Sequence, residues 1–477
     1  MIVEKAEVAV SKEILENALQ STRDERIQIL QTDVGNAAIF RELYGDDIRY
    51  CYAFRKWFVW NGKRWVMDDT GEIYRRAKKT TNRLWRGVDK FSDPDRRDRW
   101  KSHAKRSESA YRIKAMVELA QSEQGIAVAQ EKLDVEPWLL NVENGTLDLK
   151  TGSLRPHKRE DLLTKIAPVS YDEKAVCPSW NTFLNEIMPG DPDLVRFLQK
   201  AIGYSLTANT HEQVLFILYG TGANGKSTFI NTIIHLLGDY VLQIATETLL
   251  AKKHGNGIPN DVARLKSARF VAAVEAEQGR PLAEALVKQL TGGGPIAARF
   301  LYGEYFQFYP TFKLFLSVNH KPVIKGTDHG IWRRIRLIPF NVTFPPDKRD
   351  PNLSTKLVRE LPGILRWAVE GCLLWQKEGL TPPNAVRAAT EDYRLEMDVV
   401  GDFIVECCEE VLGAKTPFKD LFEKYTEWSS QNGDCSPDRK EFASGLSERG
   451  FGSGKNKAFG RFRWGIRIKA DDGKGDR

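Results

Sequence analysis

The stretch LYGTGANGKST, residues 218–228, constrains the fold of this chain more than any other. Its Gly-x-x-x-x-Gly-Lys-Ser spacing is that of a nucleotide-phosphate loop. The unbroken apolar run 214–219 before it predicts a strand that is buried on both faces. The run 228–237 after it predicts a helix, which a glycine then ends. A strand, a loop and a helix in this order predict an α/β fold built around a phosphate site.

The loop predicts a site for ATP and Mg²⁺. Its glycines let the backbone approach phosphates, and the helix N-terminus offers unpaired N–H groups and a partial positive charge. Lys226 is expected to reach the β- and γ-phosphates, and Ser227 to ligate Mg²⁺. The alternative, a glycine-rich turn with a chance Lys-Ser pair, is disfavoured by the flanking strand and helix. The residues predicted to bind the nucleotide are Gly220, Gly222, Asn224, Gly225, Lys226, Ser227 and Thr228.

Two carboxylates follow a second predicted strand, 269–274. Glu275 and Glu277 stand at its C-terminal end, where sites gather in open α/β sheets. One would orient water or bind Mg²⁺, and the other could act as the base. Glu275 is the stronger candidate for the metal because it directly follows the strand. The alternative is a pair of solvated acids.

Two downstream features complete the predicted catalytic set. The predicted strand 313–318 ends at Asn319, whose amide can contact the γ-phosphate and align the attacking water. Arg333 and Arg334 precede another predicted strand, 337–340. Guanidinium groups stabilise charge on a transferring phosphoryl group, often from a neighbouring subunit. The sequence leaves open which arginine does so, and the alternative for both is a surface salt bridge.

Composition and patterning predict a soluble globular chain of several domains. The 477 residues are 42% hydrophobic and 28% charged, and no apolar run reaches transmembrane length. Six scattered cysteines without a CxxC pair argue against a zinc site or a disulfide framework and favour a cytoplasmic protein. The predicted domains are an N-terminal α+β region of uncertain role, 1–110, a helical region, 111–205, the nucleotide-binding block, 206–380, and a small basic domain, 384–477.

The N-terminal half carries two hairpin signals and one basic stretch. Asn61-Gly62 and Asn144-Gly145 each separate two strand-like runs. The stretch 75–106 is rich in Lys and Arg, but aspartates interleave with its second part. A salt-bridged helical surface is therefore as well supported there as a binding surface.

The C-terminal segment has the pattern of a winged helix-turn-helix. It predicts a helix over 418–428, a second helix capped by Ser436 with Pro437 in its first position, and a basic hairpin without acids over 449–469. Alternation places one basic face toward phosphates and one apolar face, with Trp464, toward the helices. The alternative is a solvated strand. The predicted DNA contacts are Lys455, Lys457, Arg461, Arg463, Arg467 and Lys469.

In this order, the motifs resemble the superfamily 3 helicases, and more closely the helicase part of phage and plasmid primase-helicases, which are related to the poxvirus primase-helicase. The resemblance is strong over 130–345 and rests on YGTGANGKST, RFVAAVEAEQGR, LTGGGPIAARFLYGEYFQFYPTFKLFLSVNHKP, DHGIWRRIRLIPF and, upstream, LLNVENGTLDLKTGSLRPH. It implies an AAA+-like core, a helical collar that supports oligomerisation, a hexameric ring, and ATP-driven 3′-to-5′ translocation on single-stranded DNA.

The resemblance also implies roles for single residues. Glu275 would belong to Walker B and Asn319 would be sensor 1. Many relatives have two adjacent acids at Walker B, whereas Ala276 separates them here, so the identity of the base stays open. The family's channel hairpin corresponds to 299–306. Its DNA contacts would be Lys288, Arg299 and Tyr302, which offer charge to phosphates and a stacking face to a base.

The predicted function is an ATP-driven replicative DNA helicase of a phage or mobile element. It would act as a ring in the host cytoplasm on single-stranded and forked DNA, with a primase or an initiation protein as a possible partner. Primase activity is not predicted, because 1–110 holds no convincing primase acids. The alternatives are an ATP-dependent origin-binding initiator without processive unwinding, a DNA-binding structural protein with a vestigial ATP site, and a small-molecule kinase. A kinase explains neither the hairpin nor the wing.

Overall fold

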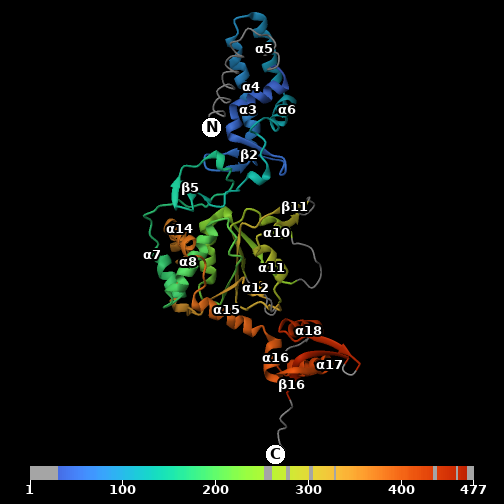
Figure 1. The fold of residues 1–477 in the computed structure, drawn as a ribbon. Helices are drawn as coiled ribbons and strands as arrows, with labels where there is room; N and C mark the ends of the chain where they lie inside the picture. The colour runs from blue at the N-terminus through green and yellow to red at the C-terminus, as the bar shows by residue number, and fades with distance from the viewer. Residues whose placement is uncertain are drawn as a thin grey trace, which may run out of the picture. The chain divides into compact units, whose positions relative to one another are not determined.

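The computed structural model describes residues 31–251, 260–274, 280–299, 305–326, 329–432, 438–457 and 460–469. The chain divides into two compact units, 1–173 with 237–240, and 174–236 with 241–477 (Figure 1). This division differs from the four predicted domains. No boundary lies at residue 110, because Met116 of α6 (Ala110–Ala120) packs in one buried cluster with Phe40 of α3 (Asp33–Tyr44).

The first unit combines helices with two small antiparallel sheets. Its other long helices are α4 (Glu72–Gly87) and α5 (Pro94–Ser107). The first sheet has the order β1 (Ile48–Cys51), β2 (Lys56–Trp60), β3 (Trp65–Met67). The predicted Asn61-Gly62 hairpin is confirmed between β2 and β3. Gly62 has φ +96°, and the Asn61 side chain accepts hydrogen bonds from the backbone N–H groups of two following residues.

The second sheet of this unit surrounds a buried asparagine. It consists of β4 (Leu139–Val142), β5 (Gly145–Asp148) and β6 (Ser153–Arg155), and it confirms the predicted Asn144-Gly145 hairpin. Asn141 in β4 is fully buried. Its Nδ2 donates to the carbonyls of Lys63 and Lys165, at 3.0 and 3.1 Å, and its Oδ1 accepts from Thr146 Oγ1 at 3.2 Å. These bonds satisfy the amide and join three segments of the unit.

The second unit is built on a five-stranded parallel sheet of order β13-β7-β12-β9-β8. Each strand predicted around the nucleotide loop is present, with bounds within two or three residues of the prediction. The first four residues of β7 are buried, as the unbroken apolar run required. The strands are β7 (Leu215–Tyr219), β8 (Val241–Ala245), β9 (Phe270–Val274), β12 (Lys313–Val318) and β13 (Ile335–Pro339).

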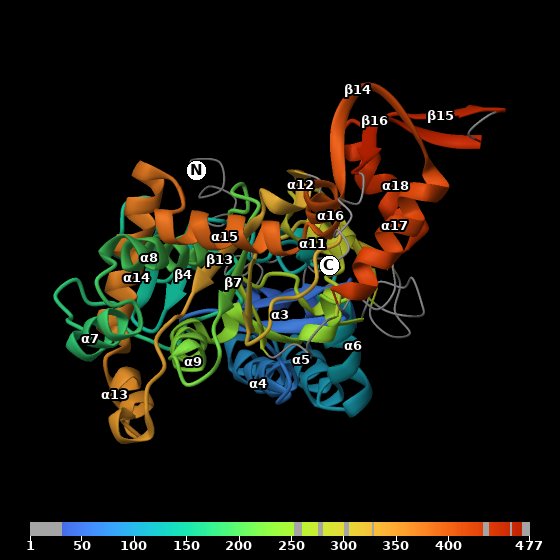
Figure 2. The same ribbon diagram turned by 90° about the horizontal axis from the view of Figure 1, so that it is seen from below.

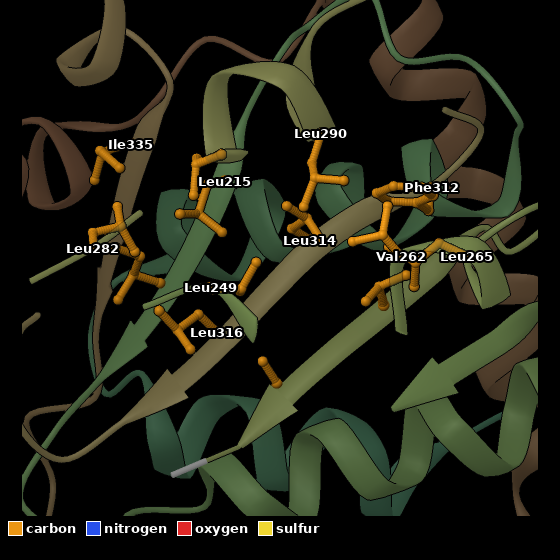
Figure 3. Close-up of a cluster of buried hydrophobic side chains, with 14 of the residues drawn as sticks. Leu215, Leu249, Val262, Leu265, Leu282, Leu290, Phe312, Leu314, Leu316 and Ile335 are labelled. Atoms are coloured by element: carbon orange, nitrogen blue, oxygen red, sulfur yellow. The ribbon is translucent and has the colours of Figure 1, made fainter. Parts of the chain in front are cut away.

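Alternate residues of these strands form two cores. On one face, aliphatic side chains such as Leu215 and Leu314 meet Leu290 of α11 (Glu284–Thr291) and Val262 of α10 (Asn260–Arg264) (Figure 3). On the other face, the rings of Phe216, Phe315 and Phe270 stack across β7, β12 and β9, with centroids 4.6 and 4.4 Å apart. Both faces of the sheet are therefore covered, as expected for a parallel sheet.

The sheet is surrounded by α7 (Pro178–Ile187), α8 (Pro192–Leu206), α9 (Lys226–Leu237), α12 (His329–Trp332), α13 (Leu353–Arg359) and α14 (Leu361–Glu378). Helices α8 and α14 cross in close contact at two glycines. A Cβ at Gly203 would lie 2.1 Å from the backbone N of Cys372, and one at Gly371 would lie 2.1 Å from the carbonyl of Gln199. Only glycine permits this approach of the two backbones.

The predicted start of the C-terminal domain at residue 384 is wrong. Helix α15 (Asn384–Glu396) packs along β13 of the central sheet (Figure 2). Tyr393 is fully buried in the sheet's aliphatic cluster, and its ring lies 5.4 Å from that of Trp332. The pair Pro382-Pro383 therefore precedes a helix that belongs to the parallel-sheet core, not a separate domain.

The separate C-terminal fold begins with α16 (Val399–Cys407). It continues through β14 (Cys408–Pro417), α17 (Phe418–Gln431), α18 (Arg439–Glu448), β15 (Ser453–Asn456) and β16 (Gly460–Ile468), with the sheet order β14-β16-β15. The predicted start of the second helix is wrong. Asp438 caps α18 by accepting from the N–H groups of Lys440 and Glu441, at 2.7 and 3.0 Å. Ser436 and Pro437 lie outside the described residues.

The remaining strands, β10 (Ile296–Arg299) and β11 (Tyr305–Phe308), form the hairpin predicted between the second and third strands of the block. Within the described ranges, no group of three or more His, Cys, Asp or Glu could hold a metal ion. None of the helices built from those residues is long and apolar enough to cross a membrane.

Candidate nucleotide site

The loop between β7 and α9 owes its shape to its glycines. Gly222, Ala223 and Gly225 have φ values of +106°, +48° and +88°. A Cβ on Gly220 would lie 2.2 Å from Asn224 Nδ2 and 2.4 Å from the carbonyl of the residue after β13. The backbone can therefore wrap around the start of α9 only with small residues at these positions.

Lys226 is the central cation of the loop. It is 4% exposed, and its Nζ donates to Gly220 O at 2.6 Å, to Asn224 Oδ1 at 3.1 Å and to Asn319 Oδ1 at 3.1 Å. Burial lowers the pKa of Lys226, and none of its three acceptors carries a charge. A buried ammonium whose acceptors are all neutral has the chemistry to take an anionic phosphate.

Asn319 reaches the loop because β12 lies beside β7 in the sheet. Both strands are parallel, so their carboxyl ends meet at one edge. The bond from Lys226 to Asn319 joins two residues that are 93 positions apart in the sequence. The predicted convergence of the loop and this asparagine is present in the fold.

A cavity of about 230 Å³ opens at this edge. Its lining includes Val274, the last residue of β9, and Ser317 of β12. Glu275 and Glu277, predicted to act next to Val274, lie outside the described residues. The predicted nucleotide-binding residues that line the cavity are Gly222, Asn224, Gly225, Lys226, Ser227 and Thr228.

A second cavity of about 550 Å³ borders the same loop at Ala223, Gly225 and Thr228. Its other walls are α7, with Phe183, and the segment 344–356, with Phe344. The sequence motifs indicated no functional role for α7 or for the segment 344–356. For α7, the sequence held only an indirect signal, which is the glycine at position 225. A Cβ on Gly225 would lie 2.5 Å from Ile187 and 3.1 Å from Phe183. The loop glycine therefore serves the packing of α7 as well as the turn.

The two arginines after α12 differ in environment. Arg334 is 9% exposed, donates from Nε to Thr291 Oγ1 at 3.1 Å, and donates to the carbonyl of Gly330. Arg333 is exposed, and its Nη2 donates to Gln213 Oε1 at 2.7 Å. Arg334 therefore stabilises its own subunit, whereas the Arg333 guanidinium lies at the surface.

Sequence families cover most of the described chain. Residues 37–189 match the family described as D5 N terminal like, and residues 395–461 match the one described as poxvirus D5 protein-like. Residues 218–334 match a family of unknown function. Two separate parts of the chain, which together make up less than half of its length, thus match models of D5-like proteins. This confirms the resemblance drawn from the motifs.

Large DNA viruses encode relatives of this chain. A protein of Acanthamoeba polyphaga mimivirus named "Putative helicase" is 28% identical over 343 residues, which are 66% of this chain and 36% of the relative. One of African swine fever virus named "Putative primase" is 24% identical over 331 residues, 63% of this chain and 34% of the relative. The chain thus spans about a third of the length of these curated relatives. The apo structure of the NrS-1 C-terminal region aligns with a TM-score of 0.46 and 9% identity, covering 87% of this chain and 94% of that chain.

The predicted channel hairpin lies only in part within the described residues. Lys288 is half-buried on α11, and Arg299 is exposed at the end of β10. The pairing of β10 with β11 runs from Ile296 with Phe308 to Arg299 with Tyr305. Tyr302 lies outside the described residues. The hairpin prediction is confirmed, and its DNA contacts stay a prediction.

The predicted basic face of β16 is wrong at Arg463. This residue is 5% exposed, and its guanidinium donates to Ser447 Oγ at 2.7 Å, to Phe451 O at 3.0 Å and to Ala443 O at 2.6 Å. Trp464, predicted to pack inward, is 40% exposed. The cause is an irregularity in which residues 411–414 of β14 stand opposite Gly465 alone, which has φ +79°. Beside this glycine, Arg463 and Trp464 have exchanged sides, while Phe462 stays buried and Arg461 stays exposed as predicted.

The other predicted wing contacts fall into two groups. Lys469 Nζ donates to the carbonyls of Val405 and Glu406, at 2.6 and 3.1 Å, and so caps the end of α16. Arg467 lies 3.5 Å from the Glu409 carboxylate. The cations that are exposed at the tip of the hairpin are Lys455, Lys457 and Arg461.

Replacing Arg463 by Ala is expected to lower the free energy of unfolding of the C-terminal fold by about 2–3 kcal/mol, because the buried Phe451 carbonyl would lose its donor and the guanidinium's contact with the Phe418 ring would be lost. Arg461→Ala removes a cation at the exposed tip of the same strand and is the matched control, with a change expected within about 0.5 kcal/mol. Thermal unfolding of both variants measures the difference. Equal unfolding temperatures would contradict a structural role for Arg463.

Proposed function

We propose that this D5-like chain is the ATP-driven motor of a DNA helicase that acts in replication. The observation that carries the proposal is the bond between the buried Lys226 and Asn319 at the edge of a parallel sheet. A phosphate loop and a polar strand end that meet in this way form the core of an AAA+-like ATPase site. The names of the viral relatives support the assignment to DNA rather than to a small-molecule substrate.

The chain's own residues can bind and orient Mg²⁺–ATP. Lys226 would exchange its neutral acceptors for the β- and γ-phosphates, and Ser227 would ligate Mg²⁺ together with Glu275. Asn319 would hold the attacking water near the γ-phosphate, and Glu275 or Glu277 would accept its proton. Bound Mg²⁺ supplies neutralisation of the phosphate charge. The nucleoside would occupy the 550 Å³ cavity between α7 and the segment 344–356.

The C-terminal fold is proposed to be a winged-helix DNA-binding domain. Its order of helix, strand, helix, helix, strand and strand supports this, since the last two strands then form the wing. Lys455, Lys457 and Arg461 at the tip of that hairpin would contact phosphates. Arg463 is withdrawn from the proposed contacts because its guanidinium is bound within the fold.

The ATP site would be completed by a neighbouring subunit. Arg333 is proposed as the finger that reaches the γ-phosphate of the next site, because it is the exposed member of the pair. A finger supplied by a neighbour needs a closed head-to-tail ring. If this ring is a hexamer, Lys288 and Arg299 near the β10–β11 hairpin would contact a single DNA strand in its channel. The ring would move along that strand in the 3′-to-5′ direction.

Strand displacement tests the proposal. A forked duplex with a 3′ tail or a 5′ tail is incubated with ATP and Mg²⁺, beside a Lys226→Ala control. Unwinding of the 3′-tailed substrate, absent in the control, is expected. Unwinding from the 5′ tail alone would reverse the proposed direction of translocation. Equal unwinding by the Lys226→Ala protein would contradict the assignment as an ATP-driven motor.

A second candidate is an ATP-dependent origin-binding initiator that remodels DNA without processive unwinding. The three-helix, three-stranded C-terminal fold favours it, because such folds read duplex DNA. ATP hydrolysis with sequence-selective duplex binding, and without strand displacement, would replace the helicase by this function.

A further inference from the structure

Helix α4 in the first unit carries a row of cations that the nucleotide site does not use. Lys78, Lys79, Arg83 and Arg86 are all exposed. At 100° per residue they fall within about 140° of the helix circumference. The buried residues of the helix, which include Ile73, Ala77, Thr80, Thr81, Leu84 and Gly87, occupy the opposite side. We call these four cations the α4 row.

Within the described part of the chain, the side chains of the α4 row make no hydrogen bond or ion pair, and only the backbone of Lys78 accepts a side-chain bond, from Thr81 Oγ1 at 2.8 Å. The acid of the helix, Glu72, binds Arg75 and Arg76 instead, at 2.7 and 3.2 Å. It stands one full turn or more before the row begins. The cations are therefore available to an external anion.

The spacing within the row costs helix stability. Lys79 and Arg83 are four residues apart, and Arg83 and Arg86 are three apart. Like charges at these spacings destabilise a helix by about 0.2–0.5 kcal/mol per pair. Only Arg86 lies in the last turn, where the helix dipole favours a cation. The buried face of α4 offsets this small cost within the fold, and an anionic partner bound to the row would remove the repulsion.

Helix α5 shows the contrasting arrangement. The aspartates that interleave with the basic stretch 75–106 belong to the α4–α5 connection and to the first half of α5. Asp95 precedes Arg99 by four residues, and Asp98 precedes Lys101 by three, which are favourable spacings. The sequence left a salt-bridged surface and a binding surface equally supported over the whole stretch. Both helices carry a net positive charge, but only α5 has acids at favourable spacings from its exposed cations, whereas no acid of α4 lies three or four residues from the α4 row.

We propose that the α4 row binds the phosphodiester backbone of DNA. This site is additional to the contacts proposed for the β10–β11 hairpin and for the wing. From Lys78 to Arg86 the helix rises about 12 Å. A DNA strand presents about one phosphate per 3.4 Å of duplex axis, so this length matches roughly four phosphates. Four cations and four phosphates are complementary in number and in length. The match is between cations and backbone phosphates, which are the same in every sequence, so the binding is expected to depend little on base sequence.

The test replaces all four cations of the row by Gln in the full chain and measures DNA affinity by fluorescence anisotropy over a range of salt. A matched variant changes Arg99, Lys101, Lys105 and Arg106 of α5 to Gln, which removes the same formal charge. The probes are a thymidine oligonucleotide and a duplex of mixed sequence. The α4 variant is expected to bind at least tenfold more weakly at low salt. Its slope of log affinity against log salt should fall by about 3 on the single strand, at roughly 0.7 per phosphate contact.

The α5 variant is expected to change affinity less than threefold. An equal loss in both variants would show general charge attraction and would overturn the site, as would an α4 variant with unchanged affinity. Loss on one probe alone identifies that form of DNA as the ligand. Unfolding temperature should not fall in the α4 variant, because repulsive pairs are removed. ATP turnover without DNA should also stay unchanged, so failure of the α4 row is distinguishable from failure of the motor.

Discussion

Replacing Arg333 by Ala is expected to lower DNA-stimulated ATP turnover about a thousandfold without lowering the unfolding temperature. An arginine supplied to a neighbouring phosphate site contributes about 10³–10⁵ to turnover in related phosphoryl-transfer enzymes. Arg333 is exposed and its guanidinium has a surface partner, Gln213 Oε1 at 2.7 Å. Its loss therefore removes little from the fold of its own subunit.

Arg334→Ala is the matched control for this prediction. Arg334 is 9% exposed and bonded to Thr291 Oγ1 and to Gly330 O, so its removal deletes two hydrogen bonds and the packing of a buried side chain. A loss of roughly 2 kcal/mol of unfolding free energy is expected, with turnover of the folded fraction largely retained. Steady-state ATPase assays and thermal unfolding separate the two effects. A turnover loss at Arg334 with an unchanged unfolding temperature, and none at Arg333, would reverse the assignment.

Mixing experiments can tell whether Arg333 acts across subunits. A Lys226→Ala subunit keeps its own Arg333, and an Arg333→Ala subunit keeps its own phosphate loop. In a mixed ring, some sites combine an intact loop with an intact finger. Partial recovery of ATP turnover on mixing two inactive variants is expected. If the mixture stays as inactive as either variant, Arg333 does not act in trans.

The parallel sheet and the nucleotide loop could be predicted from the sequence because their signals are local. A parallel strand that is buried on both faces needs a mainly apolar run; β7 reads LFILY, and β12 reads KLFLSV, in which only Lys313 and Ser317 are polar. The glycines of the loop are required by positive φ values and by close contacts. Asn319 also had a local signal, because it is the polar residue that directly follows the predicted strand 313–318. The parallel pairing of β7 and β12 then brings it to the loop.

The errors arose where distant contacts override a local pattern. Strict alternation along β16 failed because residues 411–414 of β14 oppose the single Gly465, which exchanged the environments of Arg463 and Trp464. The boundary at residue 384 failed because Tyr393 packs against Trp332, 61 positions earlier in the chain. The walls of the second cavity come from segments on both sides of the loop, and no local spacing joins them.

Replacing Trp180 by Ala is expected to lower the free energy of unfolding of the second unit by about 3–5 kcal/mol. Trp180 of α7 is fully buried, and its ring stacks on Phe229 with a centroid distance of 5.5 Å and an interplanar angle of 19°. It also meets Trp367 edge-on at 5.4 Å and Phe183 at 5.6 Å. Removing it leaves a cavity among three rings from three helices.

This change should also weaken nucleotide binding, although Trp180 does not line either cavity at the loop. Phe229 lies on α9, the helix that begins with Lys226, and Phe183 lines the second cavity. Without the Trp180 ring, Phe229 of α9 and Phe183 of α7 lose the contact that fixes the positions of their helices beside the site. Trp180→Phe is the matched control, because Trp180 Nε1 has no hydrogen-bond partner among the described residues and Phe keeps an aromatic ring. Chemical denaturation and titration with a fluorescent ATP analogue measure the two effects. Lower stability with unchanged nucleotide affinity in Trp180→Ala would contradict the coupling of this cluster to the site.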